Sequence, residues 1–138
     1  MESGKFMKIG FVNGCFDVLH IGHIRMLQFA KDHCDYLIVG IDSDSRVKTL
    51  KGLSRPINNQ DIRAEFLCSL GSVDEVRVFD SSEELISLIK SIGPNIMIVG
   101  SDYRDKVVIG SDYAKQLIFF DRIEGYSTSK IVEGLGNR

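Results

Sequence analysis

Short runs of apolar residues alternate with amphipathic stretches along nearly the whole chain. Four of the runs are rich in Val and Ile, as expected for strands buried on both faces, and a weaker fifth run follows them. The predicted strands cover residues 8–13, 36–41, 75–79, 96–99 and 117–120. Strands that alternate with amphipathic helices are typical of repeated βαβ units. We therefore predict an α/β fold with a doubly wound parallel sheet of about five strands.

Three helices are predicted between these strands. Apolar residues recur at helical spacing over 24–30, which predicts a helix that begins at two preceding histidines. A second helix is predicted over 61–70. Ser81, with Glu84 three residues later, has the pattern of a capping box and predicts a third helix that a Gly-Pro pair ends. The polar stretch 42–55 is predicted to be a loop.

Composition and charge support one folded domain and narrow the range of partners. The 138 residues are 43% hydrophobic, and we expect a single domain over 1–138 with its core at about 8–135. A net charge of −2 gives no basic field for nucleic acid or an anionic membrane. The three widely spaced cysteines are typical of reduced thiols, and no leader or membrane span is recognisable. We expect a cytoplasmic protein with neither a nucleic-acid nor a membrane partner.

The polar residues that follow the strands mark the expected binding site. In open α/β sheets, ligands bind outside the carboxyl ends of the strands. Since these ends meet at one edge, the segments that begin at Asn13, Asp42, Gly100 and Asp121 are expected to share one rim.

Two histidines, His20 and His23, lie three residues apart at the start of the first predicted helix. Free amides at a helix start favour an anion, and imidazoles on one face of the first turn can donate to the same oxyanion. Gly14 and Gly22 would let a ligand approach the backbone closely. Two alternatives are that a histidine only caps or packs the helix, or that it binds a metal, although no third ligand has a recognisable spacing. The pattern favours a phosphate chain.

The sequence His20-Ile21-Gly22-His23 matches the HxGH signature of a nucleotidyltransferase superfamily, and residues 13–20 resemble its cytidylyltransferase-like form. The stretch 122–130 is similar to the family's RxEGxSTT signature, with Ser129 where threonine is common. The resemblance runs from about residue 8 to residue 135. It is strongest to the nucleotidyltransferase domain of ADP-heptose synthases and to glycerol-3-phosphate cytidylyltransferases. It implies a Rossmann-like fold and transfer of an NMP from an NTP to a phosphorylated sugar or polyol, with release of pyrophosphate.

The resemblance also implies roles for individual residues. It implies catalytic roles for His20, His23, Lys51 and Arg122. Nucleotide binding is implied for Asn13, Gly14, Cys15, Phe16, Gly22, Lys48, Arg63, Asp102, Gly125, Tyr126, Ser127 and Thr128. Acceptor binding is implied for Asp17 and Arg55. No side chain is expected to bind a metal, and Mg²⁺ is expected on the phosphates as the cofactor.

Several of these residues have a simpler alternative role. Lys48 and Lys51 could be solvated surface charges, and Arg63 could be an ordinary arginine on a helix surface. Asp102 could only cap a turn, and Ser127 could only cap a helix.

The heptose branch and the glycerol branch of the family differ in their substrates. The Asn13-Gly14 start and the segment 54–58 favour heptose 1-phosphate with ATP, whereas Arg122 and Glu124 resemble the CTP-using glycerol 3-phosphate enzymes. Our preferred interpretation is a heptose 1-phosphate adenylyltransferase, and a catalytically silent nucleotide-binding module is an alternative of another class. A homodimer is expected from the resemblance alone, and any kinase that supplies the acceptor is expected to be a separate chain.

Overall fold

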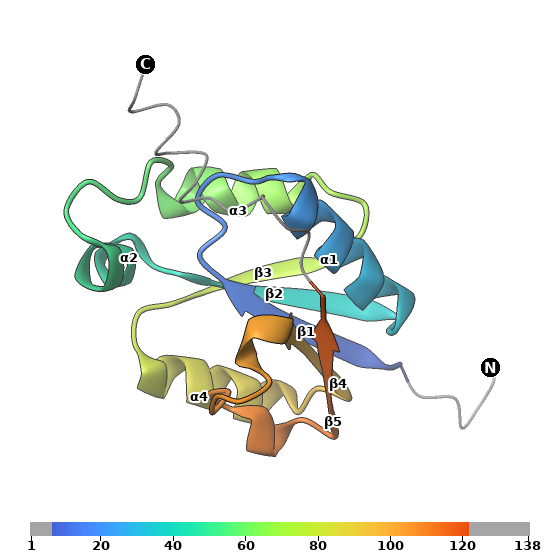
Figure 1. Ribbon diagram of the computed structural model, residues 1–138. Coiled ribbons are helices and arrows are strands. Elements are labelled where there is room, and N and C mark those ends of the chain that lie inside the picture. Colours follow the sequence, from blue (N-terminus) through green and yellow to red (C-terminus); the bar gives the residue numbers. More distant parts are fainter. Residues whose placement is uncertain (1–6, 122–138) are drawn as a thin grey trace.

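The computed structural model describes residues 7–121 and contains a parallel sheet flanked by helices (Figure 1). The main elements, in chain order, are β1 (Ile9–Gly14), α1 (Ile21–Asp32), β2 (Tyr36–Asp42), α2 (Asp44–Lys51), α3 (Gln60–Cys68), β3 (Glu75–Phe79), α4 (Ser82–Ile92), β4 (Ile96–Gly100) and β5 (Gln116–Phe120). The five strands are all parallel and lie in the order β3-β2-β1-β4-β5. The predicted Rossmann-like, doubly wound sheet is confirmed.

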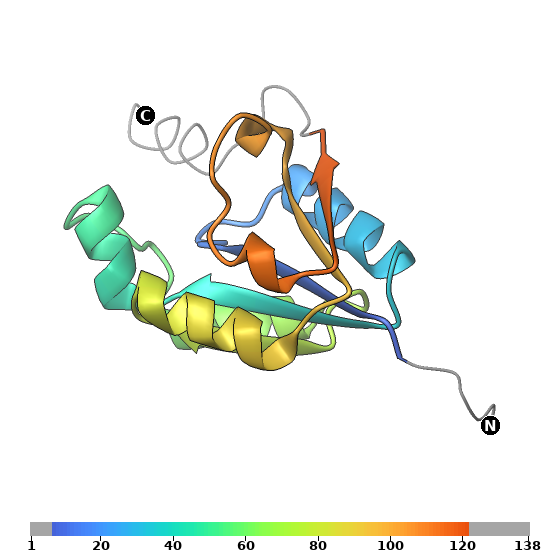
Figure 2. The ribbon, with the colours of Figure 1, turned by 90° about the horizontal axis from the view of Figure 1, so that it is seen from below.

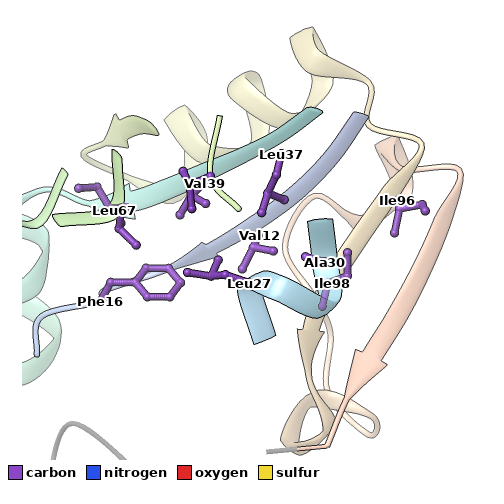
Figure 3. Packing of buried hydrophobic residues seen from close by; sticks show 11 residues of the cluster. Val12, Phe16, Leu27, Ala30, Leu37, Val39, Leu67, Ile96 and Ile98 are labelled. Atoms are coloured by element: carbon purple, nitrogen blue, oxygen red, sulfur yellow. The ribbon is translucent and has the colours of Figure 1, made fainter. Parts of the chain in front are cut away.

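Helices cover both faces of the sheet because neighbouring strand residues point to opposite sides. Phe11 of β1 packs in a cluster with Ile89 of α4, whereas Val12 packs in a second cluster with Leu27 of α1 and Leu67 of α3. Figure 2 shows α4 and α1 on opposite sides of the sheet. In the second cluster, the Phe16 ring lies beside Leu27 at the carboxyl end of β1 (Figure 3). The hydrophobic core therefore lies on both faces of the sheet.

The predicted strands and three predicted helices are present, with bounds that differ by a few residues. The prediction of a loop over 42–55 is wrong because α2 occupies much of it. Ser43 caps this helix by accepting a hydrogen bond from the Arg46 N–H, and only Val47 of the helix is buried. With one buried residue in eight, α2 has no apolar stripe that could reveal it in the sequence.

Helix α4 begins as predicted but with half of the expected capping box. The Ser81 hydroxyl accepts from the Glu84 N–H at 3.1 Å, whereas the Glu84 carboxylate accepts from the N–H of Asp80 at 2.8 Å instead of that of Ser81. Within residues 7–121, no helix is long and apolar enough to cross a membrane.

Candidate active site

The two histidines form a reciprocal cap at the start of α1. His20 Nδ1 accepts a hydrogen bond from the Gly22 N–H at 3.1 Å, and His23 Nδ1 accepts from the His20 N–H at 3.2 Å. The two rings stack with centroids 3.8 Å apart. Since Nδ1 accepts in both rings, the proton of each imidazole lies on Nε2, which is a donor there. The predicted alternative of capping is therefore present together with a donor geometry suited to an anion.

His23 is held as a neutral imidazole. Burial is the main cause that lowers its pKa to about 4, and the charges of His20 and Lys51 act in the same direction. The edge of the Phe16 ring lies against His23, with centroids 5.1 Å apart. Phe16 is only 5% exposed and belongs to the core. Its predicted role in nucleotide binding stays a prediction. The buried Phe16 ring thus packs against the His23 ring.

A glycine is required at position 22 because a side chain there would clash with His20. A Cβ at this position would lie 2.8 Å from Cε1 and 3.0 Å from Nδ1 of His20, so any side chain would displace the capping ring. The glycine is required for the His20 geometry, besides any close approach of a ligand to the backbone.

A cavity of about 340 Å³ opens where the carboxyl ends of β1, β2 and β4 meet α2 and the segment after β4. This volume lies in the usual range of small-molecule sites. Four predicted site residues line it together, which are Asn13, Gly14, Cys15 and Lys51. The expectation that the segments after the strands share one rim is confirmed for β1, β2 and β4.

The two lysines of α2 differ in their surroundings. Lys51, the last residue of the helix, lines the cavity, and its charge acts on His23 and Cys15. Lys48 lies one turn earlier and does not line this cavity, although both lysines are exposed. The geometry therefore favours Lys51 for a role in the site and a solvated surface position for Lys48.

Cys15 lines the cavity as a protonated thiol. Burial raises its pKa, although the charges of Lys51 and Arg63 act in the opposite direction. Cys15, Cys34 and Cys68 are all free thiols, as predicted.

Asp17 and Arg55, predicted to bind the acceptor, bind each other. Arg55 Nε donates to Asp17 Oδ2 at 2.9 Å, and the N–H groups of Ile57 and Asn58 donate to the same carboxylate at 2.8 Å each. The Asp17 side chain is fully buried, so the predicted contact between its carboxylate and an acceptor is corrected. Burial raises the pKa of Asp17, but the bonds from Asn58, Ile57 and Arg55 outweigh this and hold the pKa below its usual range. Arg55 Nη2 is buried without a partner, and its acceptor role stays a prediction.

Arg63 is buried, and its hydrogen bonds connect several segments of the chain. It is 1% exposed, so the alternative of a helix-surface arginine is wrong. Its guanidinium donates to the backbone oxygens of Cys15, Asp42 and Asn58 and to the Asp44 carboxylate, at 2.7 to 3.0 Å. These four oxygens occupy most of the donors that a guanidinium can offer. The prediction of a guanidinium fork that grips phosphate is corrected for this arrangement.

Arg46 is a cavity residue that the sequence interpretation missed. It lines the same cavity as Lys51, and its Nε donates to Asp42 Oδ1 at 2.7 Å. Helical spacing could not have indicated the pair, because Asp42 is the last residue of β2 and lies outside α2.

The remaining predicted residues are not tested by the described geometry. Asp102 is exposed in a 3₁₀ turn at Ser101–Tyr103. The predicted residues Arg122, Gly125, Tyr126, Ser127 and Thr128 lie outside the described residues. Among residues 7–121, no group of three or more His, Cys, Asp or Glu side chains could hold a metal ion.

Comparison with known proteins gives consistent matches. A family model described as cytidylyltransferase-like matches residues 11–134. The chain is 52% identical over 128 residues to the bifunctional protein HldE of a Nitratiruptor species, and the match covers 91% of the chain and 27% of that protein. It is 48% identical to HldE of Helicobacter hepaticus, with 95% and 27% covered, and 42% identical to HldE of Hyphomonas neptunium, with 91% and 26% covered. The chain thus spans about a quarter of the length of these relatives.

Two solved structures share the fold. The lipopolysaccharide core biosynthesis protein from Thermoplasma volcanium superposes with a TM-score of 0.72 at 22% identity, over 86% of this chain and 100% of that chain. The pantoate-beta-alanine ligase from Francisella tularensis superposes with a TM-score of 0.62 at 18% identity, over 93% and 69%.

Proposed function

The chain belongs to the cytidylyltransferase-like family and is a nucleotidyltransferase, and we propose that it transfers AMP from ATP to a heptose 1-phosphate with release of pyrophosphate. The observation that carries the proposal is the pair of stacked histidines at the start of α1, each of which accepts a hydrogen bond at Nδ1 and so leaves Nε2 as the donor. A helix start with two such donors suits the oxygens of a triphosphate.

The choice of a sugar phosphate rests on similarity. Identities of 42–52% to HldE proteins extend over nine-tenths of this chain. The resemblance to the nucleotidyltransferase domain of ADP-heptose synthases supports the same acceptor. The chain spans about a quarter of the length of those relatives. The activity of the whole relatives is therefore assigned to this chain only as part of the proposal.

The reaction needs positioning more than an activated side chain. An oxygen of the acceptor phosphate attacks the α-phosphorus of ATP and forms a new P–O bond. The bond from the α-phosphorus to the bridging oxygen breaks, and its electron pair leaves with pyrophosphate. The acceptor phosphate has a second pKa of about 6, so it is already an anion near neutral pH and no general base is required.

Residues of the chain stabilise the negative charge of the phosphates and of the departing pyrophosphate. His20 and His23 donate from Nε2 to phosphate oxygens, and their capped geometry requires little reorganisation during the reaction. The Lys51 ammonium, at the cavity wall, offsets negative charge as pyrophosphate departs. Because His23 is neutral, it acts as a hydrogen-bond donor and not as a proton source.

Mg²⁺ enters this proposal as the counter-ion of the nucleotide. The described residues provide no cluster of three acidic, histidine or cysteine ligands, and Mg²⁺ commonly keeps its waters and binds through substrate phosphates. When bound, the ion would neutralise phosphate charge, and no step above depends on it.

A substrate panel tests the proposal. Each of the four NTPs is combined with heptose 1-phosphate, hexose 1-phosphates and glycerol 3-phosphate, and pyrophosphate release is measured. The highest kcat/KM is expected for ATP with heptose 1-phosphate. A preference for CTP with glycerol 3-phosphate would replace our proposal by the alternative that Arg122 and Glu124 favour. Nucleotide binding without pyrophosphate release from any pair would identify a catalytically silent module.

We also propose a homodimer, which the family resemblance supports, and a cytoplasmic location, which the three free thiols support. Sedimentation equilibrium of the purified chain is expected to give twice the mass of 15.5 kDa. A monomer at micromolar concentration would contradict the dimer.

A further inference from the structure

One corner of the cavity holds a fixed guanidinium. Arg46 Nε donates to Asp42 Oδ1 at 2.7 Å, and Nη2 donates to the Ser82 hydroxyl at 3.2 Å. The guanidinium carbon also lies over the Phe79 ring, 5.5 Å from its centroid. Contacts to β2, α4 and β3 thus hold this side chain, which is only 16% exposed. An arginine fixed in this way loses little conformational entropy when a ligand binds it.

The pair keeps donors and an acceptor for a ligand. Within residues 7–121, Nη1 of Arg46 and Oδ2 of Asp42 have no protein partner, and both residues line the cavity. Neither atom is a buried polar group that lacks a partner, so both are open to the cavity or its solvent.

The chemistry of this corner selects hydroxyl groups. A hydroxyl both donates and accepts, so it can bind the carboxylate and the guanidinium at once. A phosphate only accepts, and the charge of Asp42 would repel it. The geometry points to Asp42 and Arg46 as the residues that bind the sugar hydroxyls of the acceptor and determine its specificity, an inference that rests on the proposed nucleotidyl transfer to a sugar phosphate.

The rest of the cavity is consistent with one orientation of this acceptor. Lys51 lines the same cavity, where the proposed mechanism assigns its ammonium to the departing pyrophosphate. Leu85, Ile98 and Val108 form an apolar wall on which the C–H face of a sugar can pack. A sugar phosphate would then place its hydroxyls at the Asp42–Arg46 pair and direct its phosphate toward the α-phosphorus of the nucleotide.

The test combines variants of the pair with substrates that lack hydroxyls. Asp42→Asn and Arg46→Gln are assayed with heptose 1-phosphate and with its deoxy analogues, and KM is measured separately for acceptor and nucleotide. Both variants are expected to raise the acceptor KM about tenfold or more while the nucleotide KM stays within about twofold. The wild type should lose a similar factor on the deoxy analogue whose hydroxyl the pair binds. On that analogue, the variants should lose nothing further.

Two further variants keep the inference falsifiable. Arg104→Gln removes an exposed arginine outside the cavity and is expected to leave both KM values unchanged. Arg46→Lys keeps the charge that pairs with Asp42 but lacks the guanidinium fork, so it should fold and still raise the acceptor KM.

Different failures have different meanings. A wild type without pyrophosphate release on the full panel would overturn the proposed function itself. An active wild type whose pair variants leave the acceptor KM unchanged would overturn only this inference. The inference would also be overturned if the pair variants had a lower melting temperature, equal changes in both KM values and the same loss of activity on every deoxy analogue. This result would show that the pair only stabilises the packing of α2 against α4.

Discussion

His20 has two roles at one position, because its Nδ1 caps α1 and its Nε2 carries the donor proton. These roles can be separated. His20→Asn keeps a side-chain acceptor for the Gly22 N–H, since Asn is a favoured N-cap, but removes Nε2. We expect the free energy of unfolding of His20→Asn to stay near the wild type and its kcat to fall at least ~10²-fold.

The matched variant is His20→Ala, which loses both roles. It should lose about 1 kcal/mol of stability in urea unfolding and the same factor in kcat. Wild-type turnover in His20→Asn would show that this histidine only caps the helix.

His23 makes stability depend on pH in a defined window. Its pKa is about 4 in the folded chain, chiefly because of burial, against an ordinary value of 6.5. Between these values the unfolded chain binds a proton that the folded chain does not. The free energy of unfolding therefore falls as the pH is lowered from 6.5 toward 4, and this contribution is fully present above 6.5.

The prediction is measured as a difference between two proteins. Urea unfolding of the wild type and of His23→Asn, which keeps an acceptor for the His20 N–H, is followed from about pH 7.5 to about pH 4.5. The stability of the wild type relative to the variant should decline below pH 6.5. A constant difference over this range would contradict a neutral, buried His23. Asp17 loses its contribution only at lower pH, because its pKa is held below the usual range.

Lys51 distinguishes transition-state stabilisation from simple nucleotide binding. If its ammonium offsets charge as the α–β bond breaks, Lys51→Ala should lower kcat and kcat/KM together, by about 10²-fold, with little change in nucleotide affinity. A ground-state contact would instead raise KM and leave kcat nearly unchanged. Lys48→Ala is the control, since Lys48 is exposed like Lys51 and lies on the same helix but does not line the cavity. Equal and negligible effects of both changes would remove Lys51 from the mechanism.

At the scale of elements, the segment between α2 and α3 depends on one buried carboxylate. Asp17 accepts from the Arg55 guanidinium and from the N–H groups of Ile57 and Asn58. Asp17→Asn would leave the Arg55 charge buried and unpaired, so we expect a loss of about 3 kcal/mol in the free energy of unfolding. Faster amide hydrogen exchange at Ile57 and Asn58 should accompany it.

The control for this change is an exposed ion pair. Asp121→Asn removes the partner of Arg104, and both side chains are more than half exposed at a separation of 3.6 Å. Its cost should be below about 1 kcal/mol. Equal costs for both substitutions would mean that the Asp17 carboxylate does not hold the segment.

The elements that the sequence reveals are those with a periodic buried face. The strands are recognisable because β1, β2 and β4 each contribute consecutive buried residues to the clusters on both faces. Helix α4 is recognisable because Leu85 and Ile89 recur at helical spacing. Helix α2 has no such face, so its local capping by Ser43, rather than its pattern, is the signal that remains.

At the scale of the whole molecule, the site could be predicted only in part. The rim of the sheet follows from parallel topology, and it brings Gly14 and Lys51 together although they are far apart in sequence. The partners of charged groups do not follow from topology. Asp17 and Arg55 are 38 residues apart, and nothing local indicates that they form an ion pair and not a ligand site. Such pairings depend on burial, which a single sequence does not show.

Arg63 connects more of the molecule than any other charged side chain discussed above. Its guanidinium joins the backbone after β1, the end of β2, the segment before α3 and the start of α2. Arg63→Lys keeps the charge but has about three N–H groups for these oxygens, in a geometry that cannot match a planar fork. Buried carbonyls left without donors cost about 1–3 kcal/mol each, so we expect a loss of about 3 kcal/mol or more in urea unfolding.

Kinetic measurements distinguish this structural role of Arg63 from its predicted role as a phosphate ligand. The structural role predicts that Arg63→Lys, assayed well below its melting temperature, keeps the wild-type nucleotide KM because the remaining folded molecules retain the His20 and Lys51 donors. A phosphate ligand predicts the opposite pattern, with wild-type stability and a raised nucleotide KM. Arg25→Lys, at an exposed position of α1, should change the stability by less than about 0.5 kcal/mol and so calibrates the effect of the substitution itself. Because its bonds to protein oxygens and its 1% exposure leave Arg63 little access to a ligand, we expect the first pattern.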